Sequence, residues 1–319
     1  MDNNKSRLKI VGITAVCTAA SMVLMLCAGI LTPLAFVFTV CTSVFSAYLY
    51  IRCGGAAACI SALLTALLML ILSGGALQVL IIAAMGFVPG LASGYSQKRC
   101  NDYYTSLGIT CTAFAVMTAA LLFYGASYVD GGINAVFNAT ADAMKESMNA
   151  IAKTEGIPFP EGYGQLIDTA VSYMKMLLPS MVIIFSMIAG YIHITAVHFF
   201  AVKVSGICPN YIPFDMHKAP RHISYVYFIA AVLLMFLNSD GKYYVIMNNV
   251  VSIFDAILAF CGLSFIENKF KGKVKIGVLR ALIYGAVLIV AKSFAVEILS
   301  LAGMLDSFAD FRKIGRIGE

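Results

Sequence analysis

The sequence predicts an all-α fold, a polytopic transmembrane helical bundle with about eight to nine spans. Hydrophobic residues make up 61% of the 319 residues, whereas only 12% are charged. Long apolar runs recur from Ile10 to Met304, and short polar segments separate them. A backbone surrounded by hydrocarbon must satisfy its own hydrogen bonds, so runs of this length predict spanning helices. The alternating pattern of barrel strands does not occur in the sequence.

Nine apolar runs are candidate spans, and we expect the chain, residues 1–319, to form a single integral membrane domain. The runs are 10–30, 34–51, 56–72, 77–95, 107–128, 173–200, 224–237, 243–266 and 276–301. Between them, residues 129–169 form the one long loop, and residues 170–303 hold the C-terminal spans. Residues 304–319 form a charged tail.

Basic residues orient these spans, because lysine and arginine accumulate in cytoplasmic loops. The chain starts with Lys5, Arg7 and Lys9. The other basic segments on the same side are Arg52, 98–99, 203–221 and 269–275. We therefore expect a multi-pass protein of the bacterial cytoplasmic (inner) membrane with a cytoplasmic N-terminus. No small-residue cleavage site follows the first run, so it is predicted to be a permanent span. Charges of both signs balance in the tail, which leaves the side of the C-terminus open.

The long loop, residues 129–169, is predicted to be extracytoplasmic, because it carries six acidic residues against two lysines. Five apolar residues recur in it at helical spacing, namely Ile133, Phe137, Met144, Met148 and Ile151. This period predicts an amphipathic helix that lies on the outer surface or caps the bundle. A gating lid and a packed surface helix both fit, and the periodicity favours the packed helix, since it reports only a buried face.

Small residues in two spans predict close helix packing. Gly86, Gly90 and Gly94 repeat every four residues and leave a flat stripe that another helix backbone can approach. Pro89 lies within this stripe and can open a backbone carbonyl to a cavity. In the first span, Ala15 and Ala19 have the same spacing.

Polar residues inside spans are the candidates for ligand binding, because burying them in lipid is costly. Asp255 lies near the middle of the eighth span and Lys292 in the ninth, at depths that permit an ion pair. Alternatively, Lys292 extends toward the interface and Asp255 bonds to a neighbouring helix. Asn249, which follows Asn248, either lines an outward-facing cavity or joins helices.

His193 is the fourth ligand-binding candidate, on the sixth span. It lies five residues before His198, so the two side chains are on different faces of a helix. A histidine pair without a convergent carboxylate is a poor metal site, and a satisfied core histidine is the more common role.

Absent motifs exclude several function classes. The sequence lacks G-x-x-x-x-G-K-[ST], H-E-x-x-H and G-x-S-x-G, so the usual ATPase, metalloprotease and hydrolase signatures fail. The nine cysteines are scattered without zinc spacing. We expect no catalytic residue, no metal site, no cofactor and no enzyme activity. The basic loops face the membrane and its lipids, so no nucleic-acid partner is expected.

The segment GMLDSFADFRK at residues 303–313 resembles the closing signature of the YybS-like family. This is a group of predicted bacterial multispanning proteins with no assigned function. The most specific residues of the signature are Asp306, Asp310, Phe311 and Arg312. Leu178-Pro179, Pro213-Phe214, Asn249 and 260–264 extend the likeness over most of the chain. Physically, the charges fit a salt-bridged turn at a helix end, which contributes little when exposed.

Residues 10–99 are also similar to the front half of the S components of energy-coupling factor transporters. Ala15 with Ala19, Gly54-Gly55 and the segment MGFVPG at 85–90 carry this second resemblance. It implies S-component-like helices over residues 10–128 that bind a small metabolite. It further implies docking on an energy-coupling transmembrane subunit with two ATPases.

Two functional hypotheses follow. The first is a component that binds or transports a small solute. The second is a structural or regulatory membrane scaffold in envelope growth or differentiation.

Overall fold

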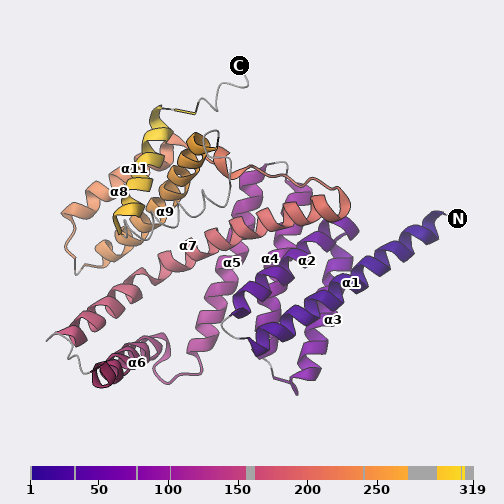
Figure 1. The fold of residues 1–319 in the computed structure, drawn as a ribbon, viewed down its shortest axis with the longest axis horizontal. Coiled ribbons are helices and arrows are strands. Elements are labelled where there is room, and N and C mark those ends of the chain that lie inside the picture. The colour runs from indigo at the N-terminus through magenta and orange to yellow at the C-terminus, as the bar shows by residue number, and fades with distance from the viewer. Residues whose placement is uncertain are drawn as a thin grey trace. The chain divides into compact units, whose positions relative to one another are not determined.

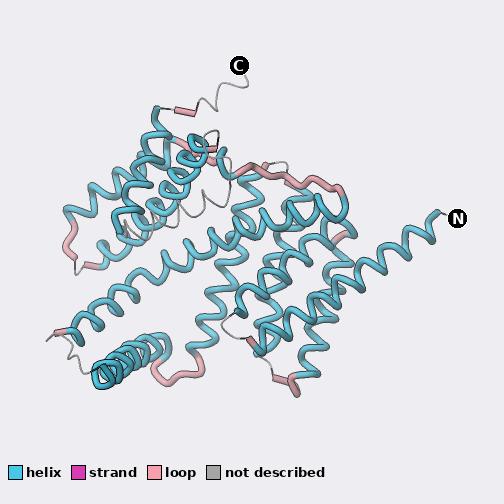
Figure 2. The backbone as a smooth tube through the Cα atoms, viewed as in Figure 1, coloured by secondary structure: helices cyan, strands magenta, loops and turns pink. Residues whose placement is uncertain are grey.

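The computed structural model describes most of the chain, and its described residues form helices joined by short loops and turns, without a strand (Figure 2). The described ranges are 2–31, 34–76, 78–100, 102–155, 162–239, 241–271, 293–309 and 311–312. The predicted all-α class is therefore confirmed.

The helices follow one another along the chain as Figure 1 labels them. They are α1 Asp2–Ile30, α2 Ala35–Cys53, α3 Gly55–Leu72, α4 Gln78–Arg99, α5 Tyr103–Ala126, α6 Gly132–Glu155, α7 Tyr163–Ser205, α8 Arg221–Phe236, α9 Lys242–Phe270 and α11 Ser293–Ala309, with a short 3₁₀ turn at Phe214–Met216. Among the described residues, seven helices are long and apolar enough to cross a membrane: α1 to α5, α7 and α9. Helix α8 is apolar but shorter. Most of the predicted ninth span, 276–301, lies outside the described residues.

Two compact units divide the chain, and each is described separately. Unit 1 consists of Met1–Thr140 and Phe185–Tyr211. Unit 2 consists of Ala141–Ile184 and Ile212–Glu319. Helix α7 contributes its first part to unit 2 and its last part to unit 1.

In unit 1, helix α2 packs against α1, α3 and α4. Half of its spanning window is buried, more than in the other candidate spans. Its sequence explains this, because small and hydroxyl side chains such as Ser43 and Ala47 let neighbours approach. Gly54 separates α2 from α3 with a φ of +97°, a conformation that glycine adopts without strain, so the chain reverses there within one residue.

The glycine stripe of α4 lies against α2. A Cβ atom on Gly90 would overlap the carbonyl oxygen of Ser43, and one on Gly94 would lie 2.9 Å from the carbonyl oxygen of Ala47. Gly86 instead lies against the side chains of Met25 and Thr42. The two backbones therefore approach closely at Gly90 and Gly94, on two successive turns.

Unit 2 contains α8, α9, α11 and the loop before α8. Leu258, Cys261 and Ala219 form its buried apolar cluster. Helices α9 and α11 meet at two glycines, since a Cβ on Gly262 would overlap the carbonyl oxygen of Leu299 and one on Gly303 would overlap that of Leu258. Neither glycine belongs to the small-residue stripes predicted from the sequence.

The segment predicted as the outer loop, 129–169, contains helix α6 and also the first turns of α7. Helix α7 begins at Tyr163, ten residues before the predicted span 173–200, so the end of the loop segment is helical. These turns are helical because Ile167 and Val171 are buried. Lys145 of α6 also pairs with Asp168, with 2.6 Å between Nζ and Oδ1.

The predicted charged tail, 304–319, also begins within a helix. Helix α11 continues to Ala309, since Met304 packs on the apolar cluster of unit 2 and Ser307 is buried.

Candidate functional sites

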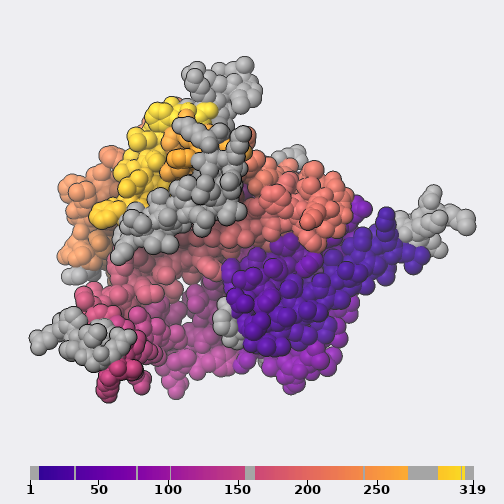
Figure 3. All heavy atoms as spheres, in the orientation of Figure 1, coloured from indigo at the N-terminus to yellow at the C-terminus, as the bar shows by residue number. Residues whose placement is uncertain are grey.

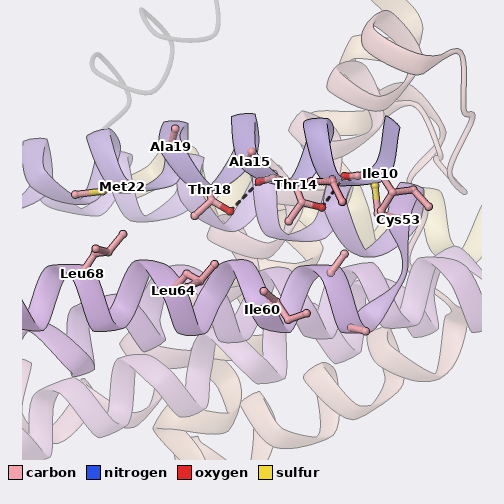
Figure 4. A pocket seen from close by; sticks show the side chains of 13 residues that line it. Ile10, Thr14, Ala15, Thr18, Ala19, Met22, Cys53, Ile60, Leu64 and Leu68 are labelled. Carbon is pink, nitrogen blue, oxygen red and sulfur yellow. Dashed lines mark hydrogen bonds between the residues drawn. The ribbon is translucent and has the colours of Figure 1, made fainter. Parts of the chain in front are cut away.

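An open groove runs between α1 and α3 on unit 1, with a volume of about 740 Å³ (Figure 4). Its walls are almost entirely apolar, including Ile60, Leu64 and Leu68 of α3, which are 53%, 46% and 40% exposed. The side chains of α1 are uncovered along much of the helix in the space-filling view, where α1 is indigo (Figure 3). Only 17% of the spanning window of α1 is buried.

Ala15 and Ala19 line this groove, and both are exposed. The rotation of α1 about its axis thus places this small-residue pair on a face that no other described helix covers. The two hydroxyl groups of the groove are satisfied internally: Thr14 donates to the carbonyl of Ile10, and Thr18 lies 2.8 Å from the hydroxyl of Ser61. The groove therefore offers shape and apolar contact but few hydrogen bonds.

A buried polar pair joins α2 and α7 inside unit 1. Ser43 Oγ lies 2.6 Å from His193 Nδ1, and neither residue is exposed to solvent. Phe114 of α5 meets the imidazole edge-on. Among the described residues, His193 Nε2 has no hydrogen-bond partner. His198 lies apart from this pair, stacked on Tyr211 with 4.3 Å between ring centroids.

Asn249 of α9 contacts the backbone of α7 in unit 2. Its Oδ1 accepts the N–H of Ser180 at 2.9 Å, and its Nδ2 donates to the carbonyls of Met176 and Val245, each at 2.8 Å. Both amide N–H donors are thereby used within the protein. Within the described part of the chain, the side chain of Asn248 makes a single polar contact, at 3.5 Å from the hydroxyl of Tyr173.

Asp255 faces α8, where the hydroxyl of Tyr227 donates to its Oδ1 at 3.3 Å. Lys292 lies outside the described residues, so the predicted Asp255–Lys292 ion pair stays a prediction.

The signature residues converge on a buried charged cluster in unit 2. The side chains of Arg312 and Asp306 are 0% and 1% exposed, and Arg312 Nη2 lies 2.7 Å from Asp306 Oδ2. Arg312 Nη1 donates to the carbonyl of Asp215 and to Ser264 Oγ, and Nη2 donates to the carbonyl of His217. The arginine thus joins the end of the chain to α9, α11 and the loop before α8.

Of the other two signature residues, the structure describes Phe311 but not Asp310. Phe311 is exposed, and its ring lies 6.1 Å from that of Phe265. Asp310 lies outside the described residues.

The loop before α8 carries charged and titratable groups beside this cluster. Lys271 Nζ lies 2.9 Å from Asp215 Oδ1, and Asn268 donates to the Asp215 carbonyl. Burial lowers the pKa of His217 to about 4, and the positive charge of Arg312 acts in the same direction.

No metal centre emerges within the described part of the chain, where no three His, Cys, Asp or Glu side chains converge. The nine cysteines are free thiols and form no pair.

Residues 19–307 match a protein family described as "Predicted membrane protein (DUF2232)". The chain belongs to this family. The YybS-like resemblance is thereby confirmed, and the chain is a multi-pass membrane protein. No curated protein and no solved structure matches the chain. The resemblance to S components stays a prediction.

Sequence reasoning missed the partners of several candidates. Ser43 lies 150 residues from His193, and neither residue carries a motif that indicates the other. Ser264 lies within the family-like segment 260–264, but its bond to Arg312 depends on a fold that brings residues 48 apart together. The acceptors from Asp215 and His217 are main-chain carbonyls, which no residue type reveals.

Proposed function

We propose that this chain is a non-enzymatic component of a bacterial cytoplasmic-membrane transporter, and that unit 1 binds a small solute in the manner of an S component. The observation that carries the proposal is the open groove along α1, in which Ala15 and Ala19 are exposed. In lipid, helices associate through close van der Waals packing at small residues. The groove therefore fits one helix of an energy-coupling transmembrane subunit, and ATP hydrolysis is assigned to that partner's ATPases.

The composition of unit 1 supports this proposal. Its described residues include six apolar helical segments, α1 to α5 and the part of α7 from Phe185 onward. Six is the number of spans usual in S components, the family that residues 10–99 resemble. Unit 2 is then an addition to that core.

The positions of basic residues support a cytoplasmic N-terminus. Arg52 lies in the last turn of α2, and Lys98 and Arg99 lie in the last turn of α4. Consecutive spans alternate in direction, so these ends share a side with the start of α1. Basic residues favour the cytoplasmic side.

We assign the solute contact to the Ser43–His193 pair rather than to Asn249. His193 Nε2 is buried without a partner among the described residues, whereas both N–H donors of Asn249 are used by backbone carbonyls. A polar solute group at Nε2 would remove the cost of burying that nitrogen unpaired.

The first test is affinity purification of the tagged, full-length protein in mild detergent, with mass spectrometry of bound proteins and retained small molecules. We expect a multi-span subunit with ATPases. Ala15→Leu combined with Ala19→Leu fills the groove and should reduce recovery of that subunit about tenfold, which corresponds to about 1.4 kcal/mol.

A control places leucine at exposed positions elsewhere on α1, with a smaller increase in bulk. Val16 and Val23 are 70% and 58% exposed and do not line the groove, so Val16→Leu with Val23→Leu should leave recovery unchanged. Equal losses in both variants would contradict docking at the groove. Recovery of envelope proteins without ATPases or a retained solute would instead favour a structural or regulatory scaffold.

A further inference from the structure

Pro179 interrupts the hydrogen-bond ladder of α7. It lies inside the helix, sixteen residues after the helix begins at Tyr163. Proline has no N–H to donate, and its ring crowds the carbonyl one turn earlier, so the helix opens on that side. The backbone groups freed at such a break require other partners when they are buried in a membrane.

The side-chain amide of Asn249 reaches both sides of this break. Its Oδ1 accepts the N–H of Ser180, which directly follows the proline, and its Nδ2 donates to the carbonyl of Met176. In an uninterrupted α-helix, the N–H of Ser180 and the carbonyl of Met176 would pair with each other. One amide, with one acceptor and one donor, thus bonds to both groups that form a single backbone bond in a regular helix.

The amide is also held in place from its own helix. Its second N–H donates to the carbonyl of Val245, one turn earlier in α9. Asn249 is buried, and Ser180 is 1% exposed, so water does not compete for these bonds. Ser180 Oγ donates to the carbonyl of Leu177, which supplies a further partner next to the break.

We propose that Pro179 and Asn249 form a clasped hinge, in which Asn249 bridges the proline break of α7 and its release lets the helix bend there. Two observations carry the proposal: the complementary pair of bonds, and the division of α7 between the two compact units five residues later, between Ile184 and Phe185. The hinge does not depend on the proposed transport function.

Hydrogen–deuterium exchange of the full-length protein in lipid nanodiscs tests the hinge, read at peptides that contain the Ser180 amide. Asn249→Ala should speed exchange there about tenfold, the factor that corresponds to loss of about 1.4 kcal/mol of protection. Asn248→Ala is the matched control, because Asn248 is equally buried but makes only the 3.5 Å contact. It should leave exchange at this site unchanged.

Pro179→Ala distinguishes a hinge clasp from ordinary helix contact. Alanine restores the missing N–H and lets the turn close, so Asn249→Ala should have less than half its effect on the logarithm of the exchange rate in this background. Equal effects in the two backgrounds would overturn the proposal, as would equal exchange in the Asn249→Ala and Asn248→Ala proteins. If Asn249→Ala does not fold, Asn249→Leu is used; it keeps the bulk of the side chain but loses the acceptor and both donors, and unchanged exchange there would equally refute the hinge.

Discussion

The two units satisfy their buried polar side chains in different ways. In unit 1, a single hydrogen bond joins Ser43 to His193, and His193 Nε2 has no hydrogen-bond partner among the described residues. In unit 2, Arg312 bonds to Asp306, Ser264 and two main-chain carbonyls, so each of its five N–H groups has an acceptor.

The difference indicates which polar groups hold a unit together and which are available for a ligand. A buried guanidinium is tolerated only when acceptors surround it, so an arginine whose N–H groups are all paired contributes to folding and has no donor left to bind anything else. An imidazole with one unpaired nitrogen is less costly to bury and keeps one site for a hydrogen bond. We therefore expect substitutions in unit 2 to affect stability most, and substitutions at His193 to affect ligand binding.

The largest expected effect is in the charged cluster. Arg312→Met should lower the free energy of unfolding by about 3–5 kcal/mol, because it leaves Asp306 buried without its counter-charge. Thermal and denaturant unfolding in detergent measure this. The exposed Arg221, which contacts the Phe308 carbonyl at 3.4 Å, is the control, and Arg221→Met should change stability by less than about 0.5 kcal/mol. Similar losses in both variants would show that the cluster has no special role.

Next in size is a pH dependence from His217. The pKa of His217 is about 4 in the folded protein, because the side chain is buried. An unfolded chain binds the proton near pH 6.5, so stability is complete above that pH. It should fall by up to about 3 kcal/mol as the pH drops from 6.5 toward 4. Arg312 adds to the lowering, while Asp215 and the backbone at Ile212 oppose it.

Unfolding measured across this pH range, with His217→Gln beside the unaltered protein, tests the assignment. The substitution should flatten the curve, whereas His222→Gln, at an exposed neighbour in the sequence, should keep its shape. An unchanged slope in His217→Gln would assign the pH dependence to other groups.

Substitutions in the Ser43–His193 pair of unit 1 should lower the free energy of unfolding less than those in the charged cluster. Ser43→Ala removes the one hydrogen-bond partner of His193 among the described residues and should cost about 1–3 kcal/mol, the penalty for a buried polar group without a hydrogen bond. Ser43→Ala combined with His193→Leu should cost less than the sum of the single changes, since no polar group is then stranded. Strict additivity in unfolding experiments would mean that the two residues act independently.

The smallest effect is expected for an exposed ion pair, which tests whether a charge pair stabilises the fold when it is not buried. Lys145 and Asp168 lie as close as the buried pair, but their side chains are 31% and 58% exposed. Lys145→Gln should therefore cost no more than about 1 kcal/mol, and high salt should reduce that cost further. A loss as large as that of Arg312→Met would mean that distance, rather than burial, determines the strength of these pairs.

The sequence predicted the features that leave a local periodic signal. The apolar runs predicted the spanning helices, and the helical spacing of Ile133, Phe137 and Met144 predicted α6. The charges of Asp306, Asp310 and Arg312 indicated a salt-bridged turn, and the structure describes a bond between Asp306 and Arg312.

Features that depend on helix rotation or on distant partners were not predictable. Asn249 was a ligand-binding candidate and Pro179 was part of the family-like sequence, but their connection depends on the depth and rotation of two helices. The exposure of Ala15 depends on which face of α1 the other helices leave open. Burial of Arg312 depends on a loop that supplies main-chain carbonyls. Every residue has such a carbonyl, so the sequence does not show which ones accept from the arginine.

The glycine contact between α9 and α11 limits how unit 2 can change shape. Gly262 and Gly303 each lie against a carbonyl of the opposite helix, so sliding one helix along the other would place a side chain where only a hydrogen atom fits. The two helices are therefore fixed in register and behave as one rigid strut. A substrate, a partner or a change of pH that acts on this strut has to move it as a whole.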